Sequence, residues 1–350
     1  MTSLYDPTRE EISAILEGEP SYRLNQLWSG LYTHFKKPAD ISNLPAALRT
    51  KIDAELPESL IEVQRSTSED GDTVKFLWHL VEGNHPIETV LMYYDDRATV
   101  CVSTQAGCAM ACGFCATGQA GFNRHLSIGE IVEQVIRSAR EAATKDRRID
   151  NIVFMGMGEP LANLDRLLPA LAIAQSPEGL GISQRRITIS TVGLPSAIDR
   201  LSHENPGYHL AVSLHAADDL LRTKLVPVNK SIGIHAILSA ADRYWETSGR
   251  RLAFEYVLLG NLNDSPDHAR SLARFIGKRA ALVNIIPYNT VDGLPWEEPT
   301  DISRERFLDV LRNAGVNVQT RKRKGSRIDA ACGQLRRLAR EKHSLSEDSE

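Results

Sequence analysis

The strongest constraint on the fold is a regular alternation of strand-like and helix-like runs that begins near Thr99. Parallel strands need long, usually helical connections, so this alternation predicts a parallel sheet with helices outside it. Roughly six strand–helix units fit before residue 320, which predicts an α/β fold in the form of a partial (βα)6 barrel with its ligands at the carboxyl ends of the strands. The strand-like runs are Val100–Ser103, Ile152–Met155, Arg186–Ser190, His209–Ser213, Leu252–Val257, Leu282–Ile286 and Val316–Thr320.

The regions on either side of this barrel differ from it in character. Near the N-terminus, Thr8 and Glu11 form a capping-box pattern, and a second such pattern, Ser127 with Glu130, opens the clearest helix of the barrel. A hairpin turn is expected at Asp70-Gly71-Asp72, between two alternating runs. The predicted regions are a small helical domain at 1–57, a strand-rich extension at 58–98, the barrel at 99–320, a basic segment at 321–343 and a disordered tail at 344–350.

Composition argues against a disordered or membrane-embedded chain. Apolar residues make up 42% of the 350 residues and charged residues 25%, which is typical of globular proteins. No apolar run approaches the ~18 residues needed to cross a bilayer. The N-terminus has neither the basic nor the apolar region of a secretory signal, so we expect a cytoplasmic protein with no membrane partner.

Positive charge is concentrated near the C-terminus. The chain carries a net charge of −4, yet the segment from Arg321 to Lys342 holds nine Lys or Arg and two acidic residues. This segment is therefore +7 and the rest of the chain −11. A local basic patch on an acidic protein indicates contact with a specific polyanion.

Three of the five cysteines lie within eight residues, in the pattern Cys108-x-x-x-Cys112-x-x-Cys115 directly after the first barrel strand. Iron–sulfur clusters are bound by such thiolates, normally four. Three thiolates would leave one iron open to a small molecule. A structural zinc site is the alternative, but it needs four closed ligands, and Cys101, Cys332 and His125 are poorly spaced to complete it.

The cysteine motif resembles the C-x3-C-x-Φ-C signature of radical S-adenosylmethionine (radical SAM) enzymes. Further motifs, over about residues 8–340, are similar to those of RNA adenine methyltransferases of the RlmN/Cfr type, most like the RlmN branch. These motifs are Cys101-Val-Ser-Thr-Gln-x-Gly-Cys108, Gly118-x-x-Gly121-Phe-Asn-Arg, Gly156-Met-Gly-Glu-Pro160, Ser213-Leu-His215 and Ala330-Ala-Cys-Gly-Gln334.

The resemblance implies one 4Fe-4S cluster held by Cys108, Cys112 and Cys115, with SAM bound at its open iron and cleaved to a 5′-deoxyadenosyl radical. Two SAM molecules would be consumed in each turnover. The cofactor carries this chemistry, while the protein orients the reactants and excludes water. The residues that the resemblance assigns to the SAM pocket are Gly158, Glu159, Ser190, Ser213, Leu214, His215 and Asn289.

The resemblance also gives the two remaining cysteines a role. Cys332 matches a methyl carrier that is first methylated by SAM and then joined covalently to the adenine ring through its methylene group. Cys101 matches the thiol that releases the product and leaves a disulfide, which must be reduced before the next cycle. Glu88 aligns with a candidate proton acceptor. Without the resemblance, each cysteine reads equally well as a small buried core residue.

The implied reaction is methylation of adenine C2 in the peptidyl-transferase loop of 23S rRNA and in tRNA, 3′ of the anticodon. The implied partners are these RNAs and an electron donor such as flavodoxin with its reductase, and the implied state is a monomer. Methylation at C8 by the antibiotic-resistance branch is the nearest alternative, since both branches share the motifs. A radical SAM enzyme acting on a small molecule and a non-catalytic, zinc-containing RNA-binding protein are more remote alternatives.

Overall fold

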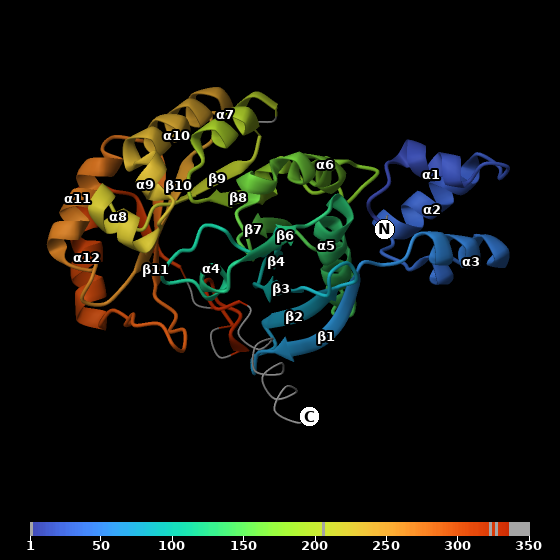
Figure 1. The fold of residues 1–350 in the computed structure, drawn as a ribbon, viewed down its shortest axis with the longest axis horizontal. Helices are drawn as coiled ribbons and strands as arrows, with labels where there is room; N and C mark the ends of the chain where they lie inside the picture. The colour runs from blue at the N-terminus through green and yellow to red at the C-terminus, as the bar shows by residue number, and fades with distance from the viewer. Residues whose placement is uncertain (1–2, 205–206, 322–323, 326–327, 336–350) are drawn as a thin grey trace.

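One ten-stranded sheet organises the chain, in the order β1-β2-β3-β4-β7-β8-β9-β10-β11-β12. The computed structural model describes residues 3–204, 207–321, 324–325 and 328–335 (Figure 1). A separate two-stranded sheet pairs β5 with β6. The strands are β1 (Leu60–Thr67), β2 (Thr73–Leu80), β3 (Pro86–Tyr93), β4 (Ala98–Cys101), β5 (Gln105–Gly107), β6 (Phe122–His125), β7 (Asn151–Phe154), β8 (Ile187–Thr191), β9 (His209–Ser213), β10 (Leu252–Leu258), β11 (Ala281–Pro287) and β12 (Val318–Thr320).

From β4 onward every pairing in the large sheet is parallel, and helices connect each strand to the next. The helices cover the outside of the curved sheet (Figure 1). The predicted α/β fold with a parallel sheet of the partial-barrel type is therefore confirmed. The helices are α4 (Ala116–Gln119), α5 (Ile128–Ala143), α6 (Leu164–Gln175), α7 (Pro195–Glu204), α8 (Asp219–Leu225), α9 (Asn229–Ile232), α10 (Ile234–Ser248), α11 (Pro266–Ile276) and α12 (Asp301–Asn313).

Three antiparallel strands extend this sheet at one edge. β1 pairs with β2, β2 with β3 and β3 with β4, so the extension and the barrel share one continuous sheet. The predicted turn at Asp70-Gly71-Asp72 lies between β1 and β2, where Gly71 takes a positive φ of 71°. On this sheet, Val90 of β3 pairs with Cys101 of β4, and the two side chains therefore share a face.

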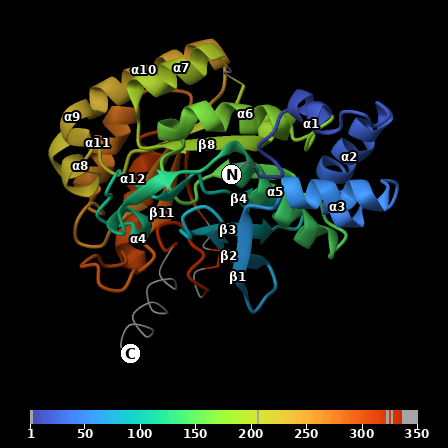
Figure 2. The same ribbon diagram turned by 45° about the vertical axis from the view of Figure 1, so that its right-hand side comes forward.

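Three N-terminal helices, α1 (Arg9–Ile15), α2 (Tyr22–Tyr32) and α3 (Ala46–Glu55), lie to one side of the barrel in both views (Figures 1 and 2). The Thr8–Glu11 capping box is confirmed at the start of α1. Arg140 of α5 ties these helices to the barrel. Its guanidinium donates to Phe35 O at 2.5 Å, to Glu58 Oε1 at 2.6 Å and to Tyr5 Oη at 3.0 Å.

The strand expected at Val100–Ser103 ends earlier, at Cys101, and the β5–β6 hairpin that follows was not expected. The backbone leaves the sheet because Ser103 is bonded elsewhere. Its N–H donates to Gln134 Oε1 at 2.8 Å and its hydroxyl to Glu88 O at 2.6 Å. The hairpin clamps both ends of the cysteine loop and thereby fixes the loop at the carboxyl end of β4.

The Ser127–Glu130 capping box is confirmed at α5, where Glu130 also binds Arg124. Among the described residues, no helix is both long enough and apolar enough to cross a membrane. The predicted tail at 344–350 and most of the basic segment lie outside the described residues.

Candidate active site

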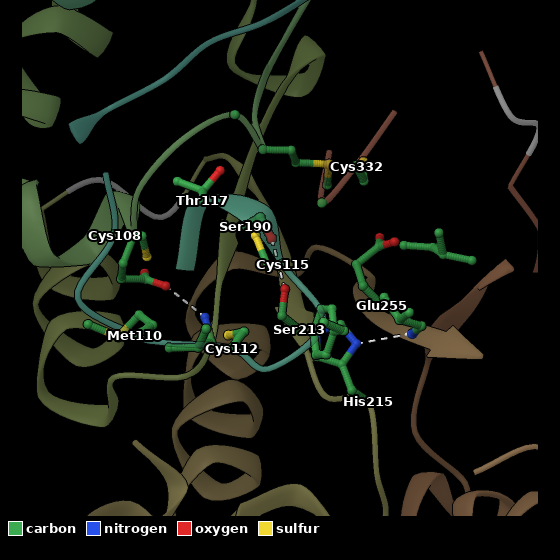
Figure 3. A pocket seen from close by; sticks show the side chains of 18 of the residues that line it. Cys108, Met110, Cys112, Cys115, Thr117, Ser190, Ser213, His215, Glu255 and Cys332 are labelled. Carbon is green, nitrogen blue, oxygen red and sulfur yellow. Dashed lines mark hydrogen bonds between the residues drawn. The ribbon is translucent and has the colours of Figure 1, made fainter. Parts of the chain in front are cut away.

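A cavity opens at the carboxyl ends of the parallel strands, where the barrel fold places ligands. Side chains from the cysteine loop and from the ends of β7, β8, β9, β10 and β11 line it (Figure 3). Ten of the predicted site residues are among them: Cys108, Cys112, Cys115, Gly158, Glu159, Ser190, Ser213, His215, Asn289 and Cys332.

The three cysteines of the loop all line this one cavity. Cys108 N–H donates to Gly121 O at 2.8 Å, and Cys115 N–H donates to Cys112 O at 3.2 Å. A glycine is required at position 107, because φ is 77° and an added Cβ would lie 2.0 Å from Gly121 O. The hairpin thus holds the loop in the conformation that gathers the thiols.

Burial raises the pKa of each loop cysteine, to about 12 for Cys108 and well above the ordinary value for Cys112. The thiols also raise one another's pKa, which shows that they lie within electrostatic reach. Bound iron would favour the thiolates, because metal ligands must be deprotonated. Among the described residues, no group of three or more Cys, His, Asp or Glu is arranged to hold a single metal ion.

Glu159 is a buried carboxylate at the end of the loop after β7. Its Oε2 accepts from Val192 N–H at 2.8 Å and its Oε1 from Leu161 N–H at 3.1 Å. Burial raises its pKa to about 7. Gly158 has φ of 100°, and an added Cβ would lie 2.5 Å from Gln105 Cβ, so this turn accepts no side chain.

The ends of β8 and β9 present a polar wall to the cavity. The hydroxyls of Ser190 and Ser213 lie 3.2 Å apart. His215 accepts a hydrogen bond at Nδ1 from Val257 N–H at 3.0 Å (Figure 3). Its ring also packs edge-on against Phe114. Leu214, predicted with them, does not line the cavity: its side chain is fully buried and its N–H donates to Glu255 O.

The three loop cysteines supply the thiols that an iron–sulfur cluster needs, and buried oxygens without a hydrogen bond indicate that the cavity also fits SAM. Asn289 Oδ1 is buried with no hydrogen-bond partner, although Asn289 Nδ2 donates to Cys332 O at 3.3 Å. Glu255 Oε2 is also buried without a hydrogen bond, although the Arg321 guanidinium lies 3.8 Å from it. Because such atoms are normally satisfied, they indicate a ligand with donor groups. An amino acid ammonium and ribose hydroxyls, both present in SAM, are donors of this kind.

Cys332 joins this cavity to a smaller one that also contains Cys101. Cys101 ends β4 and is buried, and burial together with Cys332 raises its pKa to about 12. All five cysteines are free, so the disulfide of the expected cycle is not present in this structure. Two thiols far apart in the sequence are thus brought to one place.

Arg321 belongs to the basic segment in the sequence, and its position in this site was not predicted. The structure places its guanidinium inside the site, lining both cavities. Its Nη1 lies 3.2 Å from Met155 Sδ and 3.8 Å from Glu255 Oε2. Cys332, Glu255 and Cys101 all raise its pKa, so it is a fixed cation beside both thiols. Arg327 and Arg336, which the sequence sets beside Cys332, lie outside the described residues.

Glu88 lines neither cavity. Its fully buried carboxylate forms an ion pair with Lys75, with Nζ and Oε1 3.1 Å apart. Lys75 Nζ also donates to Asp329 O at 3.2 Å, in the segment that carries Cys332. Val90, the next residue on the same face of β3, lines the smaller cavity. The role of Glu88 as a proton acceptor stays a prediction.

Comparison with known proteins identifies the family of this chain. The model of the radical SAM superfamily matches residues 102–274. A relative from Rhodopirellula baltica, "Probable dual-specificity RNA methyltransferase RlmN", is 50% identical over 92% of this chain and 86% of its own length. A relative of the same name from Thermobifida fusca is 47% identical over 94% of this chain and 93% of its own length. This chain belongs to the RlmN family of radical SAM RNA methyltransferases.

The fold comparison agrees with this membership. The crystal structure of a radical SAM methyltransferase from Sphaerobacter thermophilus superposes with a TM-score of 0.93 at 42% identity, covering 96% of this chain and 99% of that one. The predicted family and the predicted class of enzyme, a SAM-dependent RNA methyltransferase, are confirmed. Membership of the radical SAM family also implies a 4Fe-4S cluster and SAM as cofactors.

Proposed function

We propose that this RlmN-family enzyme methylates C2 of adenine in 23S rRNA and in tRNA, through a methylated Cys332 and a transient RNA–protein adduct. The relatives are named dual-specificity RNA methyltransferases, which supports two kinds of RNA substrate. The observation that carries the mechanism is the position of Cys332, on both the cavity of the cysteine loop and the cavity of Cys101. A methyl carrier has to reach SAM on one side and the resolving thiol on the other.

The cluster would be held by Cys108, Cys112 and Cys115, and when bound it supplies the electron that generates a radical from SAM. Glu159, Asn289 and the serines of β8 and β9 would hold and orient SAM. Glu159 offers its carboxylate to the ammonium group, a charge-assisted contact that is stronger than a neutral one. Two SAM molecules per turnover follow, since one methylates Cys332 and one supplies the radical.

The two cysteines outside the loop would carry the methyl group and release the product. Cys332 carries the methyl group on its sulfur, and this methyl would lose one hydrogen atom to the radical derived from SAM. The methylene carbon would then form a carbon–carbon bond to adenine C2, while the C2–H proton leaves to a base and one electron returns to the electron-transfer system. The Cys101 thiolate then attacks the sulfur of Cys332 and forms a disulfide. The electron pair of the broken carbon–sulfur bond passes to the methylene carbon, which takes up a proton and becomes the product methyl. Arg321, beside both thiols, favours the thiolate that attacks.

The alternative at the level of regiochemistry is methylation at adenine C8, since the site residues named here are common to both branches. The names of the relatives favour the RlmN branch. Digestion of the RNA product and comparison of its mass spectrum and retention with 2-methyladenosine and 8-methyladenosine standards decides between them. We further propose a cytoplasmic monomer that receives electrons from a flavodoxin-type donor.

The proposal is tested with two single cysteine variants. Cys332→Ala is expected to lose RNA methylation and to keep the cluster absorbance and SAM cleavage, because the cluster ligands lie elsewhere. Cys101→Ala is expected to accumulate a covalent RNA–protein adduct, visible as a slow band on a denaturing gel. Free RNA with normal turnover in Cys101→Ala would exclude Cys101 as the resolving thiol.

A matched metal analysis tests the cluster itself. Anaerobic assays on the wild type are expected to give about four irons and four sulfides per chain. A variant with Cys108, Cys112 and Cys115 all replaced by Ala is expected to lose both. One zinc and no iron in the wild type would refute the radical mechanism.

A further inference from the structure

Arg222 of α8 is a buried arginine whose hydrogen bonds all go to neutral groups. The residue is 0% exposed. Its Nε donates to Leu214 O at 3.0 Å and its Nη1 to Asn229 Oδ1 at 2.6 Å. Its Nη2 donates to Val192 O at 2.5 Å and Ser213 O at 3.1 Å. The guanidinium is therefore well bonded, while its charge is not neutralised by any of these partners.

The nearest acidic group reaches Arg222 only through an intermediate side chain. Asn229 Nδ2 donates to Asp219 Oδ1 at 2.8 Å, and Asn229 Oδ1 accepts from Arg222. Burial lowers the pKa of Arg222 to about 10, so the group still carries its positive charge at neutral pH. A buried charge without an opposite charge is costly. The protein tolerates this cost, which indicates that an anion completes the site.

The cysteine loop lies directly against the helix of Arg222. Gly113 N–H donates to Leu225 O at 2.9 Å, at the end of α8. Cys112, Leu225 and Val192 pack in one apolar cluster. Arg222 Nη2 donates to the backbone of Val192 at 2.5 Å, so the guanidinium lies beside the apolar cluster that contains Cys112. The anion that faces Arg222 is thus the sulfur of Cys112 and whatever is bound to it.

We propose that Arg222 is a fixed positive charge that raises the reduction potential of the 4Fe-4S cluster. The inference rests on the proposed assignment of Cys112 as a cluster ligand. Reduction takes one electron from an external low-potential donor and leaves the cluster one unit more negative, with no bond formed or broken. The charge around a cluster is one of the factors that set its potential. A guanidinium acts strongly here because the surroundings are apolar.

A purely structural role for Arg222 has to be separated from this electrostatic role. Its bonds to Val192, Ser213 and Leu214 also tie together the ends of β8 and β9. Arg222→Lys keeps the charge and loses most of these bonds. Arg222→Gln loses the charge and keeps an amide donor. If Arg222 acts through its charge, the reduction potential of the cluster changes in Arg222→Gln and not in Arg222→Lys. A purely structural role would instead lower the stability of the fold in both variants, because both lose hydrogen bonds.

A third variant changes the charge balance without altering Arg222. The double substitution Asp219→Asn with Asn229→Asp leaves the total charge unchanged and moves the carboxylate to the position 2.6 Å from Nη1. The side-chain amide introduced by Asp219→Asn would still offer an oxygen to Ile234 N–H, which Asp219 Oδ1 accepts at 2.8 Å. This exchange neutralises the guanidinium while the arginine bonds remain.

The experiment is a potentiometric titration of the anaerobically reconstituted full chain, followed by the EPR signal of the reduced cluster. Arg222→Gln and the exchange variant are expected to reduce at least tenfold less favourably, which is 59 mV more negative for one electron. Arg222→Lys is expected to stay near the wild type. Equal potentials in all four proteins, or equal shifts in Arg222→Gln and Arg222→Lys, would overturn the inference.

Two further outcomes are informative. If Arg222→Gln does not fold or takes up no cluster, the exchange variant and Arg222→Lys still decide, since they keep a cation at this position. If the wild type itself assembles no cluster, the proposed function is refuted, and the inference about Arg222 is refuted with it. The measured quantity is a potential, so the result does not depend on RNA methylation.

Discussion

At the scale of single residues, His215 is held neutral by its surroundings. Burial, and after it Arg222, lowers the pKa of His215 to about 3 from the ordinary 6.5. Nδ1 accepts a hydrogen bond from Val257 N–H, so the ring proton sits on Nε2. A neutral imidazole at the cavity wall can donate to a ligand without adding positive charge beside the bound ammonium of SAM.

This shift predicts a loss of stability in acid. Below pH 6.5 the unfolded chain gains a proton at His215 that the folded protein does not, so the free energy of unfolding falls as the pH falls. Between pH 7 and pH 5, the cluster-free wild type is expected to lose about 2 kcal/mol more than His215→Gln. Urea unfolding at both pH values measures this difference. Equal losses in the two proteins would show that His215 does not titrate below its ordinary range.

Lys75 and Glu88 form a buried ion pair near the site, and Lys75 also donates to the backbone of Asp329. Lys75→Met removes the cation and leaves the Glu88 carboxylate buried, which is expected to cost roughly 3–5 kcal/mol of unfolding free energy. The double variant Lys75→Met with Glu88→Gln is expected to recover much of this loss. Denaturant titrations of the wild type and the two variants measure both values. Identical losses in the single and double variants would mean that the buried charge of Glu88 is not what destabilises Lys75→Met.

At the scale of elements, the β5–β6 hairpin is what shapes the cysteine loop. Gly107→Ala is expected to abolish cluster assembly, because the new Cβ would lie 2.0 Å from Gly121 O. Gly121→Ala is the matched control: its φ of 80° is similar, but nothing lies within 4 Å of an added Cβ. It is expected to cost about 1 kcal/mol of backbone strain and to keep the cluster. Iron and sulfide assays on both variants test this, and equal iron contents would contradict it.

The same elements show how far sequence reasoning extends. Runs of apolar residues predict the barrel strands, because strands covered by helices have to be apolar. The polar residues that follow these strands then lie together at the cavity. The hairpin escapes prediction because Gln105–Gly107 is three residues long and shows no alternation. The roles of Arg222 and Arg321 could not be predicted from the sequence, because arginine is usually a surface residue. Their burial depends on contacts with strands that are distant in the sequence.

At the scale of the whole molecule, two cations of the basic segment already contact other parts of the protein. Arg321 lies within the active site. Lys324 is bonded to Asp72 Oδ2 at 2.9 Å and to Tyr93 O, and its ammonium lies 4.5 Å from the centre of the Tyr94 ring. These contacts hold the segment that carries Cys332 against the β1–β2 turn and the end of β3. We therefore expect any phosphate binding by this segment to come from its seven other cations, all of which lie outside the described residues.

This division predicts which cations contribute to the salt dependence of RNA binding. Each cation that neutralises a phosphate adds about 0.7–0.9 to the slope of log K against log salt concentration. In a Cys332→Ala background, which prevents turnover, Lys324→Gln is expected to leave the slope unchanged, because its ammonium is already bonded to the protein. Lys322→Gln with Arg323→Gln is expected to lower the slope by about 1.4–1.8. Fluorescence anisotropy with a labelled RNA hairpin at several salt concentrations measures each slope. A decrease in Lys324→Gln as large as that in the double variant would show that Lys324 leaves Asp72 and Tyr94 to bind phosphate.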